Sequence, residues 1–261
     1  MRSGSRLWDI FAVVVYGFLF APIIVVAIAS INPSGMAFPP EGITARWYLE
    51  MLNDSQLASA VVVSLVVATA ATAITLPIVL LMGLALRDAE FPGATMLENF
   101  FLAPISVPQV VVGLSLLIYF NAFGLVGTIT GLIFGHFVIT VPYALRTILA
   151  ALKGFDPALE EAAANLGATR FATVRYVTLP LVRPAVIAGA GFAFVMSLTN
   201  FTISIFLVGS QTVTLPVQIY QYVTFSIDPA VTAIATILAL TSLAVVILIE
   251  RLVGVQELSG I

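Results

Sequence analysis

The side chains of this chain that could do polar chemistry are concentrated between Asp156 and Pro184. This segment reads DPALEEAAANLGATRFATVRYVTLPLVRP and carries the charged residues Asp156, Glu160, Glu161, Arg170, Arg175 and Arg183. Apolar residues lie between these charges. Such a pattern either forms a solvated amphipathic face or presents ion-pairing groups to a partner, and composition alone favours the solvated face.

Local signals predict two short helices in this segment. The pair Asp156-Pro157 supplies an N-cap and a first helical residue, and the two glutamates that follow form an acidic first turn that suits the helix dipole. Gly167 is expected just beyond the helix end, where it adopts a positive φ without steric cost. A second helical run is expected over about residues 169–177, ending before the Leu-Pro pair at Pro180.

The rest of the chain is apolar. Of its 261 residues, 61% are hydrophobic and 9% are charged, whereas soluble domains carry about 25% charged residues. The sequence therefore predicts an all-α integral membrane protein. The chain has no cysteine, which excludes disulfides and thiolate chemistry. It also lacks the basic patches with interleaved aromatic residues that indicate nucleic-acid binding.

Six segments are long and apolar enough to cross a membrane, which takes about 20 residues. They cover about residues 10–30, 57–86, 96–120, 128–149, 185–208 and 229–250. The third is interrupted by Pro104 and Pro108. A Gln- and Thr-containing linker is expected over residues 209–227. The sequence is consistent with a single transmembrane domain over residues 1–261.

The positive charges predict the orientation of these spans. In a six-span arrangement, one side carries Arg2, Arg6, Arg87, Arg146, Lys153, Arg170, Arg175, Arg183 and Arg251. Only Arg46 falls on the other side. Because Lys and Arg favour the cytoplasmic side, both termini and the loop at about 153–184 are predicted to be cytoplasmic. A five-span or seven-span arrangement would mix the charges.

The spans carry almost no ionisable side chain. His136 is the only one well inside, and we expect it to be a hydrogen-bonded core residue. Ion-coupled transporters require an intramembrane relay of ionisable groups, and membrane-embedded enzymes require a nucleophile with a base. The sequence offers no catalytic or metal-ligating group. A self-contained secondary transporter or channel remains an alternative, because backbone carbonyls of broken helices can coordinate cations.

Two places combine polar side chains with helix breaks and are candidate parts of a solute pathway. Ser106 and Gln109 lie at the double-proline break of the third span. Thr199 and Asn200 lie within the fifth span. Such groups line transport pathways or hydrogen-bond between helices, and the sequence leaves both roles open.

The order of residues in the charged segment resembles a known signature. Glu161-Ala162-Ala163 is followed by three residues and Gly167, then by nine residues and Val177, and after one more residue by Leu179-Pro180. This spacing resembles the EAA signature of the inner-membrane permease subunits of binding-protein-dependent ABC importers, with Val177 where the family has Ile. The segments PPEGITARWYLEML, LKGFDPALEEAAANLGA and TVTLPVQIYQYV resemble the polyamine (spermidine/putrescine) branch of that family.

The resemblance implies a type I (MetI-like) permease fold in a bacterial inner membrane, with a coupling helix that contacts ATPase subunits. The residues it places at or beside that contact are Glu160, Glu161, Ala162, Ala163, Gly167, Arg170 and Arg175. It implies a second, different permease chain, two copies of an ATP-binding subunit and an extracytoplasmic solute-binding protein. ATP and Mg²⁺ would bind the ATPase subunits, because this chain has no GxxxxGK[ST] motif.

The resemblance leaves the solute open. Polyamine members of the family carry carboxylates near positions 109, 199 and 200, where this chain has Gln109, Thr199 and Asn200. A polyamine entering low-dielectric surroundings favours an opposing charge. The neutral residues therefore leave polyamines, amino acids, other zwitterions and anions as candidate solutes.

Overall fold

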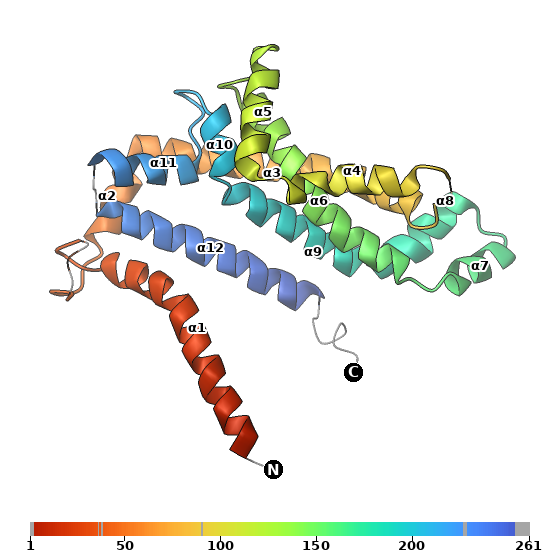
Figure 1. The fold of residues 1–261 in the computed structure, drawn as a ribbon, viewed down its shortest axis with the longest axis horizontal. Coiled ribbons are helices and arrows are strands. Elements are labelled where there is room, and N and C mark those ends of the chain that lie inside the picture. The colour runs from red at the N-terminus through yellow and green to blue at the C-terminus, as the bar shows by residue number, and fades with distance from the viewer. Residues whose placement is uncertain (1–2, 36, 38, 90, 227–228, 254–261) are drawn as a thin grey trace. The chain divides into compact units, whose positions relative to one another are not determined.

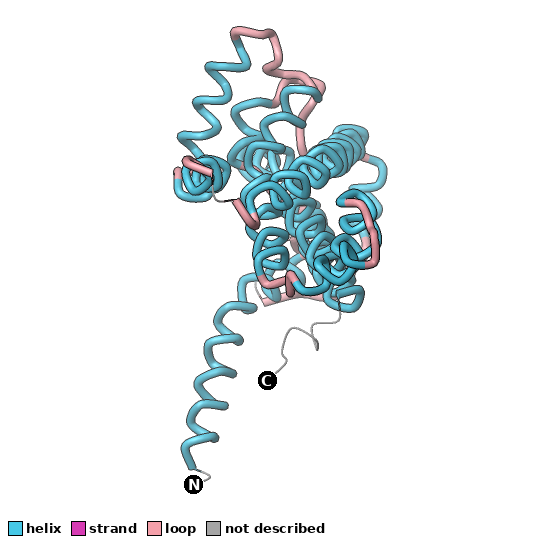
Figure 2. The backbone as a smooth tube through the Cα atoms, turned by 90° about the vertical axis from the view of Figure 1, so that its right-hand side faces the viewer, coloured by secondary structure: helices cyan, strands magenta, loops and turns pink. Residues whose placement is uncertain are grey.

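A computed structural model describes residues 3–35, 37, 39–89, 91–226 and 229–253. The described residues form helices and loops without a strand (Figure 2). The chain divides into two compact units, one made of residues 1–59 and 218–243, the other of residues 60–217 and 244–261. The prediction of a single domain over residues 1–261 stays a prediction.

The first unit contains α1 (Ser3–Ala29) and α2 (Arg46–Asn53), joined by a loop that one asparagine organises. The Asn32 side chain accepts hydrogen bonds from the loop amides of Ser34 and Glu41 and donates to the carbonyls of Gly35 and Ala37. Trp47 of α2 donates its indole N–H to the Asn32 carbonyl over 2.8 Å. Trp47 packs against Ala230 and Ala233 at the start of α12 (Ala230–Val253).

Most of α3 (Ser55–Leu86) belongs to the second unit, which also holds α4 (Ala94–Ser106), α5 (Gln109–Asn121), α6 (Ile129–Lys153), α7 (Ala158–Asn165), α8 (Arg170–Thr173), α9 (Leu179–Leu198) and α10 (Thr202–Leu207). Helix α6 packs along α9 and also against α4, and α5 packs against α10 (Figure 1). Gly113 permits the last contact, because a Cβ there would lie 2.5 Å from the Phe206 ring.

Five helices are long and apolar enough to cross a membrane, in the part of the chain that the structure describes. They are Ile10–Ala29, Ser55–Leu86, Ile129–Lys153, Arg170–Leu198 and Ala230–Arg251. The third predicted span, residues 96–120, is instead a pair of helices, α4 and α5, that bend by 105° at a short break. Pro104 lies inside α4 and Pro108 is the N-cap of α5, so the break lies at Val107 and Pro108. If the bent pair counts as one span, there are six.

The structure differs from the sequence expectation around the fifth span. The second loop helix does not end before Pro180, since α8 continues through a π-helical turn (Val174–Thr178) into α9. Pro180 lies just after this π-helical turn inside a continuous helical path, and π-helical turns are among the features that accompany bends in long helices. The apolar helix thus ends at Leu198, and the residues predicted to finish the span form the separate helix α10.

The expected linker at 209–227 also contains structure. Helix α11 (Leu215–Gln221) and a π-helical turn (Tyr222–Ser226) lie within it. The Ser64 hydroxyl of α3 accepts a hydrogen bond from the Leu215 amide over 2.7 Å, which fixes the start of α11. The segment that its polar composition predicted to be a linker is therefore largely helical.

Candidate functional site

The segment between Asp156 and Pro184 has the predicted helix–corner–helix form. Asp156 accepts a hydrogen bond from the Ala158 amide over 3.0 Å, just before α7, whose N-cap position is Pro157, one residue later than predicted. Gly167 has a φ of 87°, as predicted for the corner. Thr169 caps α8 by accepting from the Ala172 amide. These local contacts agree with the capping and glycine signals in the sequence.

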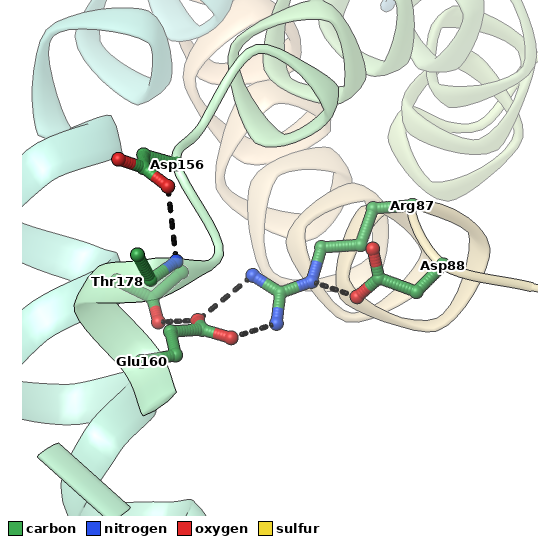
Figure 3. A network of polar contacts seen from close by, with 6 residues as sticks. Arg87, Asp88, Asp156, Glu160 and Thr178 are labelled. Atoms are coloured by element: carbon green, nitrogen blue, oxygen red, sulfur yellow. Dashed lines mark hydrogen bonds and ion pairs between the residues drawn. The ribbon is translucent and has the colours of Figure 1, made fainter. Parts of the chain in front are cut away.

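One glutamate of α7 points back toward the ends of two membrane helices (Figure 3). Both carboxylate oxygens of Glu160 accept from the Arg87 guanidinium, at 2.9 and 2.5 Å, and Arg87 directly follows α3. The Thr178 hydroxyl, at the residue before α9, also donates to this carboxylate. Arg87 contacts Asp88 as well, at 2.7 Å. Glu160 therefore joins α7 to the end of α3 and the start of α9.

The electrostatics of this contact favour the charged forms of both partners. The hydrogen bonds from Arg87 lower the pKa of Glu160, burial opposes the shift, and Thr178 adds to it. The same contact with Glu160 raises the pKa of Arg87. The Arg87 and Glu160 side chains are 12% and 21% exposed. A two-pronged pair with this little exposure is more than a solvated surface ion pair.

The next residue, Glu161, is exposed and makes no ion pair within the described part of the chain. Glu161 and Ala162 are exposed, Ala163 is half-buried, and Gly167 is exposed at the corner. Two large apolar side chains accompany them on the surface: Leu166 is 89% exposed and Phe171 is 76% exposed. Charge beside exposed apolar side chains is the composition of a docking surface. We call the set Glu161, Ala162, Leu166, Gly167 and Phe171 the loop surface.

The predicted arginines of the loop lie in different places. Arg170 lines a pocket together with Glu160 and Glu161. Arg175 instead lines a groove with Arg183, a residue for which the sequence predicted no role. The structure thus brings Arg170 to the glutamates and places Arg175 beside a second arginine.

The candidate pathway residues Gln109 and Asn200 meet, although they are far apart in sequence. Asn200 lies in the break between α9 and α10 and donates its side-chain amide to the Gln109 carbonyl over 3.1 Å. Its own side-chain oxygen accepts from the Ile203 amide over 2.8 Å, which caps α10. A neutral amide pair therefore lies where α5 begins and α9 ends.

His136 of α6 makes hydrogen bonds with residues on both sides of this break. Its Nδ1 is 2.7 Å from the Ser197 hydroxyl and its Nε2 is 3.0 Å from the Ser204 hydroxyl. The Ser204 hydroxyl donates to the Asn200 carbonyl, so the histidine Nε2–H is the donor to Ser204 and Nδ1 accepts from Ser197. His136 is a fully buried, hydrogen-bonded residue, as the sequence predicted, and it bridges α6, α9 and α10.

Ser106 and Thr199 lie outside this amide contact. Ser106 lines a pocket between α4 and α6 that also contains Arg146 and the ion pair between Glu98 and Lys153. Thr199 is exposed and donates its hydroxyl to a backbone carbonyl of its own helix. Their assignment to a solute pathway stays a prediction.

Sequence reasoning missed Arg87 and Thr178, the two partners of Glu160. Arg87 is 73 residues from Glu160, and no local pattern links the two. The available signal was the position of Arg87 directly after an apolar span, where a cation must find water or an acid. Of the residues that the structure describes, no group of three or more His, Cys, Asp or Glu is placed to hold a metal ion.

Comparisons with known proteins agree with this architecture. A sequence model of the family described as "Binding-protein-dependent transport system inner membrane component" matches residues 76–256. The spermidine/putrescine transport system permease protein PotC of Escherichia coli is 33% identical over 244 residues, covering 94% of this chain and 92% of the relative. The putrescine transport system permease protein PotI of the same organism is also 33% identical, covering 85% of this chain and 82% of the relative.

A solved structure has the same fold. A chain of a bacterial ABC transporter involved in the import of the acidic polysaccharide alginate superimposes with a TM-score of 0.74, at 16% identity, covering 96% of this chain and 98% of that one. At this identity the match concerns the fold alone. It confirms the predicted all-α importer permease fold.

Proposed function

We propose that the loop surface docks on an ATPase subunit and that Glu160 anchors the loop to the membrane helices. The premise is that the chain belongs to the family of binding-protein-dependent transport system inner membrane components. The chain is a permease subunit of an ATP-driven ABC importer and a transport subunit, not an enzyme. Its family membership favours this function over that of a self-contained secondary transporter or channel.

The opposite surroundings of two adjacent glutamates carry the proposal. Glu160 is bound by Arg87 and Thr178, so motion of α7 is transmitted to α3 and α9 through it. Glu161 is exposed beside Leu166 and Phe171 and is free to contact a partner. One residue thus fastens the loop inside the subunit, while the next faces outward. A docked ATPase that moves α7 would move both helix ends.

The complete importer has further parts. A second, different permease chain would complete the pathway, two ATPase subunits would bind ATP and Mg²⁺, and an extracytoplasmic binding protein would deliver the solute. The exposed apolar side chains of the loop surface, Leu166 and Phe171, would pack against the partner when it docks. Ala162 and half-buried Ala163 would let the partner backbone approach closely.

A charge reversal on the loop surface tests the docking. Glu161→Lys should abolish solute uptake and binding-protein-stimulated ATP hydrolysis while leaving the amount of chain in the membrane unchanged. The matched control is Glu50→Lys, the same change on α2, which should leave uptake within about twofold, since surface substitutions have small effects. Normal uptake by Glu161→Lys would refute the docking role of this surface.

The solute is proposed to be small and polar: a polyamine, an amino acid or another small organic ion. The relatives PotC and PotI support polyamines by name, and the neutral Gln109–Asn200 contact admits the other classes. Uptake of labelled spermidine and putrescine by cells expressing the importer, with amino acids and organic anions as competitors, tests this. Competition by amino acids without uptake of either amine would exclude polyamines. That result would leave the docking proposal standing, because the Glu161→Lys experiment also measures ATP hydrolysis, which does not depend on knowing the solute class.

A further inference from the structure

A two-arginine groove lies where α8 continues into α9. Arg175 of the π-helical turn and Arg183 of α9 line one side, and Leu179, Pro180 and Val186 form its apolar wall. Both arginines are exposed. We call these five residues the arginine groove. It contains no acidic side chain.

Neither arginine of the groove makes an ion pair within the described part of the chain. Arg175 lies over the ring of Tyr176, 5.7 Å from its centre, which restrains the guanidinium. Glu160 of the same loop is already bound by Arg87. Among the described residues, the two positive charges are therefore available to bind an anionic ligand.

The groove lies at one end of a helix that is long and apolar enough to cross a membrane, Arg170–Leu198. Arg175 and Arg183 are eight residues apart, about 12 Å along a helix axis at about 1.5 Å per residue. Tyr176 is 72% exposed beside them, and tyrosine is enriched at membrane–water interfaces. Along the chain the groove residues follow the order Arg175, Leu179, Pro180, Arg183 and Val186, so apolar side chains lie between and beyond the two arginines, and a ligand with both charged and apolar parts could use both.

We propose that the arginine groove binds the headgroup of an anionic phospholipid, with the acyl chains against Leu179 and Val186. Arginine suits this ligand because its planar guanidinium binds phosphate oxygens in pairs. The ATPase is the other candidate occupant of Arg175. It is less suited, because the apolar wall matches acyl chains and because Arg170, not Arg175, shares the pocket of Glu161.

Lipid retention measures this binding directly. The purified complex that contains the full chain is titrated with phosphatidylglycerol or phosphatidylcholine in detergent, and bound lipids are counted by native mass spectrometry. Each arginine near an anionic surface contributes about 1 kcal/mol, or about fivefold in affinity. Arg175→Gln and Arg183→Gln should each weaken phosphatidylglycerol retention about fivefold, and phosphatidylcholine retention should not change.

Arg170→Gln is the matched control, an exposed arginine of the same loop that lies outside the groove, and it should retain phosphatidylglycerol normally. The double variant Arg175→Lys, Arg183→Lys keeps the charge without the paired donors and should lose less than the Gln variants. Equal retention by all variants would refute the proposal. So would competition by inorganic phosphate at the lipid's own concentration, or loss of ATPase association by Arg175→Gln with lipid retention intact.

Discussion

Among single residues, the informative pair is Glu160 and Glu161, since identical side chains one position apart have opposite surroundings. The Glu160 carboxylate accepts from Arg87 and Thr178, while Glu161 is exposed. The first therefore contributes to the internal stability of the loop and the second to its outer surface. The two positions can be tested separately, because a change at either one leaves the other's contacts in place.

Acid should loosen the loop through Glu160. Its pKa is lowered in the folded chain, chiefly by Arg87, so the contact stabilises the loop above the unfolded-state pKa and is lost as the pH falls through the lower, folded-state value. Hydrogen exchange of the α7 amides, corrected for intrinsic rates, should rise across that acidic range. In Glu160→Gln the exchange should already be raised at neutral pH, by roughly fivefold for a contact of about 1 kcal/mol. The corrected exchange of this variant should not rise further across the acidic range.

Glu161→Gln is the control for this experiment. It removes a charge from the same helix turn without touching Arg87, so its exchange should follow the unmodified chain. Equal pH responses of Glu160→Gln and the unmodified chain would show that the Arg87 contact does not hold the loop.

The sequence predicted both glutamates as ATPase contacts, and it predicted the helix that carries them. It could not separate them, because the separation depends on Arg87, which is 73 residues away. Gly167 was predicted correctly and the cap of α7 to within one residue, because capping and positive φ are local properties. Contacts between distant elements leave no such local pattern, and His136 could be predicted as buried without its partners Ser197 and Ser204.

Among the elements, the break between α9 and α10 differs most from expectation. An apolar run with scattered Ser, Thr and Asn predicted one continuous span, and Pro180 predicted a helix end. In the structure the helix passes through Pro180 and ends instead at Leu198, where Asn200 caps α10 and His136 bonds both flanking serines. A proline inside a helix normally kinks or ends it, and here it lies just after the π-helical turn. An asparagine whose side-chain oxygen accepts from the amide three residues later can start a new helix.

The break should depend on the side-chain oxygen of Asn200. Asn200→Ala removes the cap of α10 and the contact with Gln109, which should cost about 1–2 kcal/mol and lower the melting temperature of the purified complex by about 2–8 °C. Asn200→Ser keeps a capping oxygen without adding a buried charge and loses the donor to Gln109, so its melting temperature should fall less. Equal losses for the two variants would mean that the cap does not hold the break.

For the whole molecule, the remaining question is how many times the chain crosses the membrane. Five helices pass the length and composition test, and the sixth crossing depends on α4 and α5, which bend by 105°. If this pair crosses, three spans separate the loop before α2 from the loop that carries α7, and the two loops lie on opposite sides. If it enters and returns, only two spans separate them, and they lie on the same side.

The absence of cysteine makes this a direct measurement. Ile43→Cys and Leu166→Cys place single thiols at side chains that are 85% and 89% exposed. The positive charges of the sequence predict that Leu166 is cytoplasmic. A membrane-impermeant maleimide should therefore label Ile43→Cys in intact spheroplasts and Leu166→Cys only in inside-out vesicles, prepared without the ATPase subunits so that the loop surface is uncovered. The unmodified chain, which has no thiol, gives the background. Labelling of both positions in intact spheroplasts would show that α4 and α5 re-enter the membrane without crossing it, and would move the Glu161 surface away from the side that holds ATP.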